Sequence, residues 1–137
     1  MAASGLPPAP LHFECVVPIL RVERLPASLD YYLKALGFRL DWQDPSQMAS
    51  VSRDGKGVML CQGAQGNPGT WVWFGVSDAG KLHDEVRARG AKIRMPLSNF
   101  PWAYEFHVED PDGHVLRFGS DTLPGRPFDP WGRPAVS

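Results

Sequence analysis

The sequence of 137 residues has no excess of charge of either sign, because 14 Lys and Arg face 15 Asp and Glu, for a net charge of −1. Such a balance creates no field that would hold nucleic acid or an anionic membrane surface. The sequence also has no run of about 18 apolar residues, the length that a membrane-spanning helix requires. We therefore expect neither a nucleic-acid partner nor a membrane partner.

Cysteine is scarce. Cys15 and Cys61 both lie in apolar runs, and neither belongs to a CxxC pair or has a histidine spaced as a zinc ligand. Two unpaired thiols are typical of a protein in a reducing compartment. The start of the sequence, residues 1–5, has no basic residue, so no secretory signal is expected. These features predict a cytoplasmic protein.

The length fits one domain, and 14 Gly and 14 Pro gather mainly at turns and at the ends. We expect a flexible N-terminal arm at 1–12, a single domain at 13–121 and a Pro/Gly-rich tail at 122–137. The tail contains four prolines and cannot form a regular element. Its Phe128 and Trp131 favour packing against the domain, and a flexible end is the alternative.

The first half of the domain reads as strand, helix and three strands. An apolar β-type run at 15–22 precedes apolar residues at helical spacing in 26–36. A short strand is expected at 38–42. A hairpin over 48–62 follows, and it turns at Asp54-Gly55, a dipeptide typical of tight hairpin turns.

The second half repeats this order. A strand at 70–77 leads to a helix that Asp78 caps. A strand at 92–97 and a hairpin that turns at 110–113 complete the pattern. Each βαβββ unit has a helix on one face only, so two units can pair their sheets around a concave surface, which is a common place for a ligand. The sequence therefore predicts an α+β domain in which the repeats, about 15–62 and 70–119, form a cupped, barrel-like mixed sheet with helices on the outer face.

Strand alternation divides the side chains between two faces. The apolar residues that we expect against the helices are Leu20, Val22, Val72, Phe74, Val76, Phe106, Val108, Leu116 and Phe118. The opposite, cupped face is then aromatic on one side and polar on the other. Its predicted ligand-binding residues are Trp71, Trp73, Glu105, His107, Arg117, Arg21 and Met59.

Planar rings of the cup would stack on planar ligand groups, and charged side chains would fix the ligand's orientation. We expect the charge of Arg117 to have no partner in the core, so its neutralisation should weaken binding with little effect on stability. Each role has an alternative. Trp71 and Trp73 could pack at a dimer seam, and His107 could be a structural histidine hydrogen-bonded to Glu105.

Two segments carry a resemblance to a known family. VVPILRVERLPASLDYYLKALGF (16–38) is similar to the opening strand, helix and LGF exit of the vicinal oxygen chelate superfamily, which includes glyoxalases, bleomycin-resistance proteins and dioxygenases. HVEDPDGHVLRF (107–118) is similar to the closing hairpin of that superfamily. The resemblance covers residues 15–119 and implies the same βαβββ repeat.

The metalloenzymes of this superfamily carry His, Gln or Glu ligands at four positions of the cup. The resemblance places these positions at Val17, Trp71, Arg117 and either Met59 or Cys61. None of these is a carboxylate or a histidine, and an arginine repels a cation. We therefore expect no metal site, no cofactor and no catalytic residue.

Among metal-free members, the resemblance is closest to the bleomycin-resistance proteins, which bind the antibiotic in a groove of a symmetric dimer. Three features favour this subgroup, namely Pro18 in the opening strand, TWVWF at 70–74 and Arg117. The best-known examples are strongly acidic, which suits a cationic drug, so the near-neutral charge here argues against bleomycin itself as the ligand.

Three functions follow from the resemblance. We favour a homodimer that binds and sequesters a small organic molecule of the antibiotic type, which would serve antibiotic resistance. The first alternative is a lyase or dioxygenase of the same fold with a displaced metal site or a metal-free mechanism. The second is a dimeric scaffold whose own side chains fill the cup.

Overall fold

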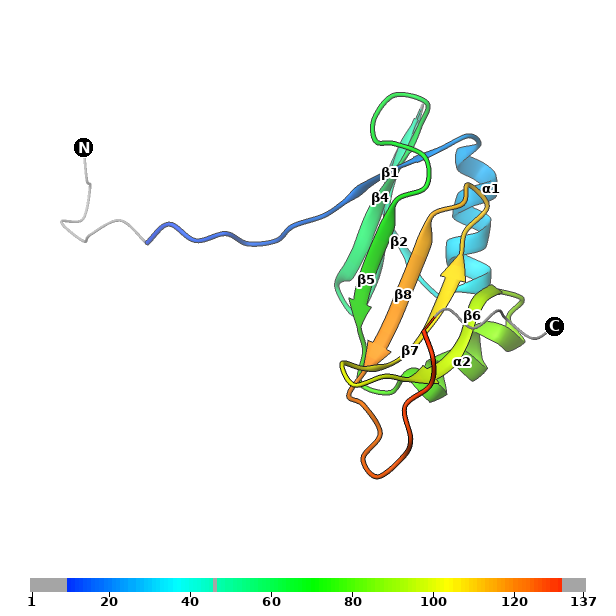
Figure 1. Cartoon of the computed structure of the whole chain (residues 1–137). Coiled ribbons are helices and arrows are strands. Elements are labelled where there is room, and N and C mark those ends of the chain that lie inside the picture. Colours follow the sequence, from blue (N-terminus) through cyan, green and yellow to red (C-terminus); the bar gives the residue numbers. More distant parts are fainter. Residues whose placement is uncertain (1–9, 46, 132–137) are drawn as a thin grey trace.

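The computed structural model describes residues 10–45 and 47–131, which form two four-stranded sheets (Figure 1). The first half consists of β1 (Ile19–Val22), α1 (Leu25–Asp30), the π-helical turn η1 (Tyr31–Ala35), β2 (Arg39–Asp44), β3 (Met48–Arg53) and β4 (Lys56–Gln62). The second half consists of β5 (Trp71–Gly75), α2 (Ala79–Ala88), β6 (Lys92–Asn99), β7 (Tyr104–Glu109) and β8 (Val115–Ser120).

Both sheets have the same topology. The strand orders are β1-β4-β3-β2 and β5-β8-β7-β6. The first strand of each half runs parallel to the last strand of that half, and all other neighbours are antiparallel. The predicted βαβββ repeat is therefore confirmed. The two sheets are cupped and separate and do not close into a barrel.

Local sequence signals explain several boundaries. Asp54 and Gly55 both have positive φ, 52° and 75°, as the turn of a two-residue hairpin requires. The Asp78 side chain accepts a hydrogen bond from the backbone N–H of Lys81 at 2.9 Å and caps α2 as predicted. These short-range preferences fix where the elements turn and begin.

The first strand and first helix differ from prediction. The strand begins only at Ile19, because the preceding Pro18 has no N–H for a ladder hydrogen bond. The predicted helix at 26–36 begins as α1 and ends in the wider turn η1, in which Leu36 N–H bonds to Tyr31 O.

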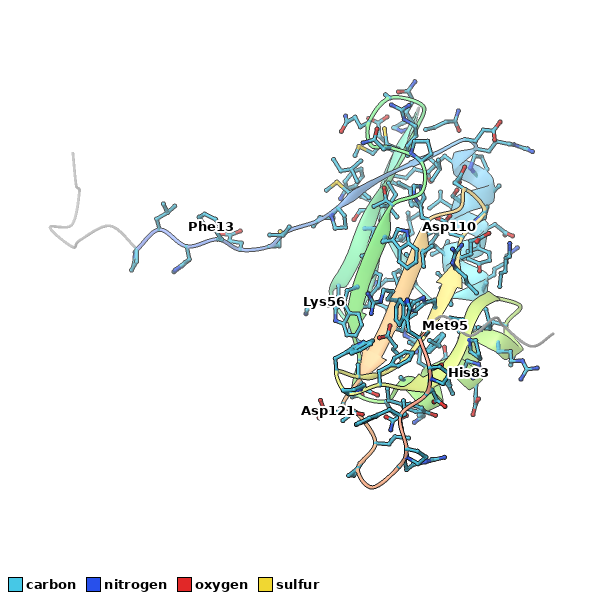
Figure 2. All side chains as sticks on the ribbon, viewed as in Figure 1. Phe13, Lys56, His83, Met95, Asp110 and Asp121 are labelled. Atoms are coloured by element: carbon cyan, nitrogen blue, oxygen red, sulfur yellow. The ribbon has the colours of Figure 1, made fainter. Side chains whose placement is uncertain are left out.

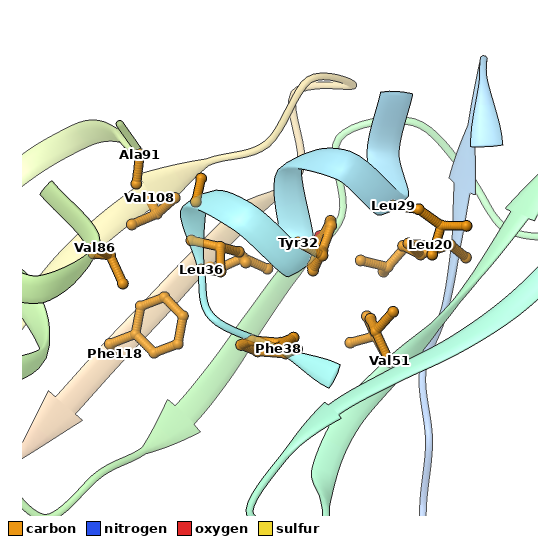
Figure 3. Close-up of a cluster of buried hydrophobic side chains, with 14 of the residues drawn as sticks. Leu20, Leu29, Tyr32, Leu36, Phe38, Val51, Val86, Ala91, Val108 and Phe118 are labelled. Carbon is orange, nitrogen blue, oxygen red and sulfur yellow. The ribbon is translucent and has the colours of Figure 1, made fainter. Parts of the chain in front are cut away.

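One hydrophobic core joins the two halves. The face opposite each cup packs against the helices, with α1 on β3 and β4 and α2 on β6, β7 and β8. Figure 3 shows Tyr32 and Leu36 between residues of the first sheet and residues of the second half. The predicted core face is confirmed, since Leu20, Val22, Phe106, Val108, Leu116 and Phe118 are all buried in this cluster and Val72, Phe74 and Val76 pack against it.

The turn between β7 and β8 ties the second half to the first. Buried Asp110 accepts a hydrogen bond from the Tyr32 hydroxyl at 2.8 Å, and Asp112 accepts from the backbone N–H of Glu23 at 2.8 Å. The His114 ring lies between the halves, with Nε2 2.6 Å from Arg21 O and Nδ1 accepting from Thr70 N–H at 2.9 Å. The DPDG turn therefore also sets the relative position of the two sheets.

The chain ends behave differently from one another. Residues 10–17 belong to no helix or strand and run away from the body, with Phe13 far from both sheets (Figures 1 and 2). Residues 121–131 turn back and pack on the second sheet, as the aromatic content of the tail favoured. The rest of the predicted arm and tail, 1–9 and 132–137, lies outside the described residues.

Within residues 10–45 and 47–131, no helix is long and apolar enough to cross a membrane.

Candidate functional site

Five of the seven predicted site residues come together on the cup face of the second sheet. Trp73 on β5 lies opposite Arg117 on β8, which in turn lies opposite His107 on β7. Trp71 and Glu105 occupy the neighbouring positions of the same face. Strand alternation alone was sufficient to predict this grouping.

Glu105 is the centre of the group. Its carboxylate has no exposed surface and accepts four hydrogen bonds. Arg117 donates from Nε and Nη2, both at 2.9 Å. The Trp102 indole N–H donates at 2.6 Å, and the His107 ring nitrogen Nε2 lies at 2.8 Å. Each carboxylate oxygen therefore has two partners, which satisfies a charge that would be costly to bury alone.

The hydrogen bonds set the protonation states. Burial by itself would raise the pKa of Glu105, but the hydrogen bonds from Arg117, Trp102 and His107 outweigh it and lower the pKa below its usual value. Burial lowers the pKa of His107, and the hydrogen bond to Glu105 opposes that effect only in part. At neutral pH Glu105 is ionised and His107 is neutral, with its hydrogen on Nε2.

This pairing corrects one expectation. The sequence predicted that the charge of Arg117 has no partner in the core, whereas Arg117 forms a two-bond ion pair with the buried Glu105. The spacing on adjacent strands explains the pair, because Arg117 and Glu105 lie diagonally across β7 and β8 on one face. The hydrogen bond between His107 and Glu105 fits the structural alternative for this histidine.

The tryptophans form an aromatic layer above this polar centre. The guanidinium carbon of Arg117 lies 5.1 Å from the centre of the Trp73 ring and 5.3 Å from that of Trp131. Arg94 lies 5.4 Å above the Trp71 ring. These are cation–π distances. Trp71 and Trp73 remain about half exposed, 51% and 48%, so part of each ring is open to a ligand.

A glycine holds one of these rings in place. A Cβ added at Gly119 would lie 2.2 Å from the Trp73 ring, closer than any real contact. The Trp73 indole therefore lies flat across β8, where a side chain would otherwise stand. At Gly75 the nearest atom to an added Cβ is Trp73 Nε1 at 3.7 Å, an ordinary contact.

The two remaining predicted residues lie on the first sheet. Arg21 is on β1 and Met59 is on β4, opposite Ile19. No hydrogen bond, ion pair or ring contact joins their side chains to the Glu105 group in the described part of the chain. The Nε of Arg21 is buried and has no hydrogen-bond partner among the described residues.

The register also decides between Met59 and Cys61 as the first-half counterpart of Arg117. α1 begins three residues after Val22, as α2 begins three residues after Val76, so the two valines correspond. Ile19 then corresponds to Trp73. Because Ile19 pairs with Met59 and Trp73 pairs with Arg117, Met59 is the counterpart.

The side chains at the expected ligand positions are poor metal ligands. Across residues 10–45 and 47–131, no three His, Cys, Asp or Glu side chains come together as metal ligands. The four positions that the resemblance assigns to ligands hold Val17, Trp71, Met59 and Arg117. Their one possible donor is a thioether, a weak ligand for hard divalent cations.

Three residues of the site were not predicted. Trp102 donates to Glu105 from the loop before β7, and Trp131 covers Arg117 from the tail. Arg94 on β6 stacks on Trp71. Trp102 and Trp131 lie in segments without strand alternation, where periodicity assigns no face. Arg94 lies next to a register irregularity of β6, which shifts the alternation.

The half-exposed rings of Trp71 and Trp73 leave this part of the cup face open to solvent. A cavity of about 360 Å³ lies elsewhere, between the β3–β4 turn and α2, and its lining includes Arg53, Asp78 and Phe118. None of the seven predicted site residues lines it. A ligand on the cup face would therefore need further walls to be enclosed.

Residues 11–118 match the model of the glyoxalase/bleomycin resistance protein/dioxygenase superfamily. The chain belongs to this superfamily. The resemblance in the opening strand and closing hairpin is thereby confirmed.

Solved structures support the same fold. The bleomycin-binding protein of Streptomyces verticillus, in complex with copper(II)-bleomycin, is 26% identical with a TM-score of 0.69, over 80% of this chain and 98% of that chain. TioX from Micromonospora sp. ML1 is 24% identical with a TM-score of 0.68, over 80% and 98%. A glyoxalase/bleomycin resistance protein/dioxygenase from Nocardioides is 19% identical with a TM-score of 0.64, over 88% and 91%. No curated protein matches the chain by sequence.

The Glu105–Arg117 ion pair allows a prediction about the free energy of unfolding. Arg117→Gln should lower the free energy of unfolding by about 3 kcal/mol, because it leaves a buried carboxylate without its main partner. The double variant Glu105→Gln/Arg117→Gln should lose less than the single variant, since no buried charge is left. Urea unfolding measures both. Equal stability of Arg117→Gln and wild type would contradict the pairing.

The close contact between Gly119 and the Trp73 ring allows a second prediction. Gly119→Ala should displace the Trp73 ring from Arg117 and lower the free energy of unfolding by about 1 kcal/mol, the value of a cation–π contact. Acrylamide quenching of tryptophan fluorescence should increase as the ring becomes exposed. Gly75→Ala is the matched control and should quench as wild type does. Identical quenching in the two variants would show that Gly119 does not position Trp73.

Proposed function

We propose that this chain is a non-catalytic binding protein that sequesters a small organic molecule with a planar ring, without a metal ion. The observation that carries this proposal is the second-sheet face, where half-exposed Trp71 and Trp73 flank a buried ion pair. Flat, rigid rings bind planar groups at low cost in conformational entropy. The bleomycin-binding relative supports a ligand of the antibiotic type.

The charges of the face indicate which ligands fit. Glu105 neutralises Arg117, and His107 is neutral, so the centre of the site has no net charge. Glu109 accepts from both Lys92 and Arg94 at the edge. A strongly cationic ligand gains little attraction from such a face. We therefore favour neutral or weakly anionic planar molecules over cationic ones such as bleomycin.

Catalysis has little support in the arrangement of the site. His107, the one histidine on the face, is buried and hydrogen-bonded to Glu105. Glu105 is fully engaged by four donors and has a lowered pKa, which makes it a weak base. The site therefore favours binding over chemistry.

We further propose that a second copy of the chain completes the groove. The cup face is open in the single chain, and Leu11, Phe13 and Val16 of the arm are each about 90% exposed. Apolar side chains at this exposure are typical of a segment that packs on a partner. Arg21, which is half-buried on β1, would supply a guanidinium donor to the ligand from the first sheet.

The ligand proposal is tested by titration. A thermal-shift screen of planar antibiotics and glycopeptides first identifies a ligand through its stabilisation of the fold. Trp71→Ala and Trp73→Ala should then each weaken its binding by about 2 kcal/mol, the cost typical of a buried aromatic anchor. Phe128→Ala is the control, since Phe128 is similarly exposed and, among the described residues, makes no ring contact with Trp71, Trp73 or Arg117. Unchanged affinity in both tryptophan variants would overturn the proposal.

The dimer is tested by sedimentation. We expect the wild-type chain to sediment as a dimer at micromolar concentration, and the double variant Phe13→Ser/Val16→Ser to shift towards monomer. Leu40→Ser, an exposed apolar residue of β2, serves as the control for a general effect of surface polarity. A wild-type chain that is monomeric at tens of micromolar would contradict a groove made by two copies.

A further inference from the structure

The C-terminal segment forms a closed loop that is fixed at both ends to one buried residue. Asn99, at the end of β6, accepts on its side-chain oxygen from Thr122 Oγ1 and from the backbone N–H of Leu123, each at 2.8 Å. Its backbone pairs with Asp129 through two hydrogen bonds of 2.8 Å. The loop between Thr122 and Asp129 is therefore anchored although it contains no helix or strand.

This anchor delivers Trp131 to the ligand face. The Trp131 ring centre lies 5.3 Å from that of Phe100 and 5.8 Å from that of Trp102. It also lies 5.7 Å from the His107 ring and 5.3 Å from the Arg117 guanidinium carbon. Both the Trp73 ring and the Trp131 ring therefore lie at cation–π distance from Arg117.

Ring contacts hold Trp131 in place, whereas hydrogen bonds to Asn99 hold the loop that carries it. Its ring contacts with Phe100 and Trp102 are tilted, at 52° and 57°, and 55% of its surface is exposed. By contrast, Phe100 and Trp102 stack at 16°. Within residues 10–45 and 47–131, the hydrogen bonds that anchor the loop to Asn99 involve Thr122, Leu123 and Asp129 and not the Trp131 ring. The ring can therefore turn away while the Asn99 anchor stays intact.

We propose that the Trp131 ring is a lid on the proposed ligand face, which covers Arg117 and His107 in the unliganded chain and swings aside when a planar ligand stacks on Trp73. This inference rests on the proposed binding function. It adds a state in which the chain's own Trp131 ring occupies the ligand site. Ligands must displace an aromatic ring of the chain itself, so the lid selects for molecules that stack better than an indole does.

The displacement step is tested with 8-anilinonaphthalene-1-sulfonate, an aromatic anion with a planar naphthalene ring whose fluorescence reports binding. Trp131→Ala should bind this probe about five-fold more tightly than wild type, because the probe no longer competes with a cation–π contact. Phe128→Ala, in the same loop and 57% exposed, should bind as wild type does. Unchanged or weaker binding in Trp131→Ala, or no binding by either protein, would overturn the lid.

A second readout needs no ligand. In the closed state His107 faces Glu105, Arg117 and Arg94, and burial lowers its pKa. Removal of the Trp131 ring should uncover the imidazole, so that its pKa, followed by NMR titration, rises towards the ordinary value in Trp131→Ala but not in Phe128→Ala. The same His107 titration in Trp131→Ala and wild type would show that Trp131 does not cover the site.

The two readouts separate the lid from the binding function. A rise in the His107 pKa together with tighter probe binding supports the lid, whichever residues the probe stacks on. If Trp73→Ala leaves probe affinity unchanged while Trp131→Ala raises it, the lid stands and the stacking role of Trp73 fails. Asp129→Ala, which removes a side-chain bond of the anchor, should move both readouts in the same direction as Trp131→Ala.

Discussion

The proposed ligand face depends on one buried carboxylate. Glu105 has no contact with solvent, so its charge is tolerable only because Arg117, Trp102 and His107 all donate to it. These donors come from β8, from the loop before β7 and from β7 itself, and the carboxylate draws them to one point. The orientation of the arginine then fixes where the rings of Trp73 and Trp131 can stack.

The repeated βαβββ unit explains why such a face exists. Each unit covers one side of its sheet with a helix, and the two covered sides share one core. The other side of each sheet is left without a helix. In the second half this side carries tryptophans and a neutralised ion pair, and in the first half it carries Arg21 and Met59. The same architecture thus provides both the stable core and the open surface to which we assign the proposed ligand.

The family shares its fold across different activities, and the side chains of the cup separate them. The bleomycin-binding relative and this chain share fold and about a quarter of their residues. Here, the face has a neutral centre formed by a buried ion pair and an aromatic ring contributed by the tail. These features suit stacking with an uncharged or weakly anionic ring more than attraction of a cation.

Periodicity in the sequence was sufficient to predict the repeat, the core face and the grouping of Trp71, Trp73, Glu105, His107 and Arg117, because alternation along a strand assigns each side chain to a face. It could not predict the pairing of Arg117 with Glu105, which depends on the register between β7 and β8. Alternation also gave no information on Trp131, since its position depends on hydrogen bonds between Asn99 and a segment without regular structure.

The most direct test of a planar ligand on the tryptophan face is ¹⁹F NMR of the protein labelled with 5-fluorotryptophan. Its resonances are assigned by single Trp→Phe variants. We expect a bound ligand to shift the resonances of Trp71 and Trp73 through the ring current of the stacked group, while the Trp102 indole keeps its hydrogen bond to Glu105. A saturating ligand that leaves both the Trp71 and Trp73 resonances unmoved would contradict the account.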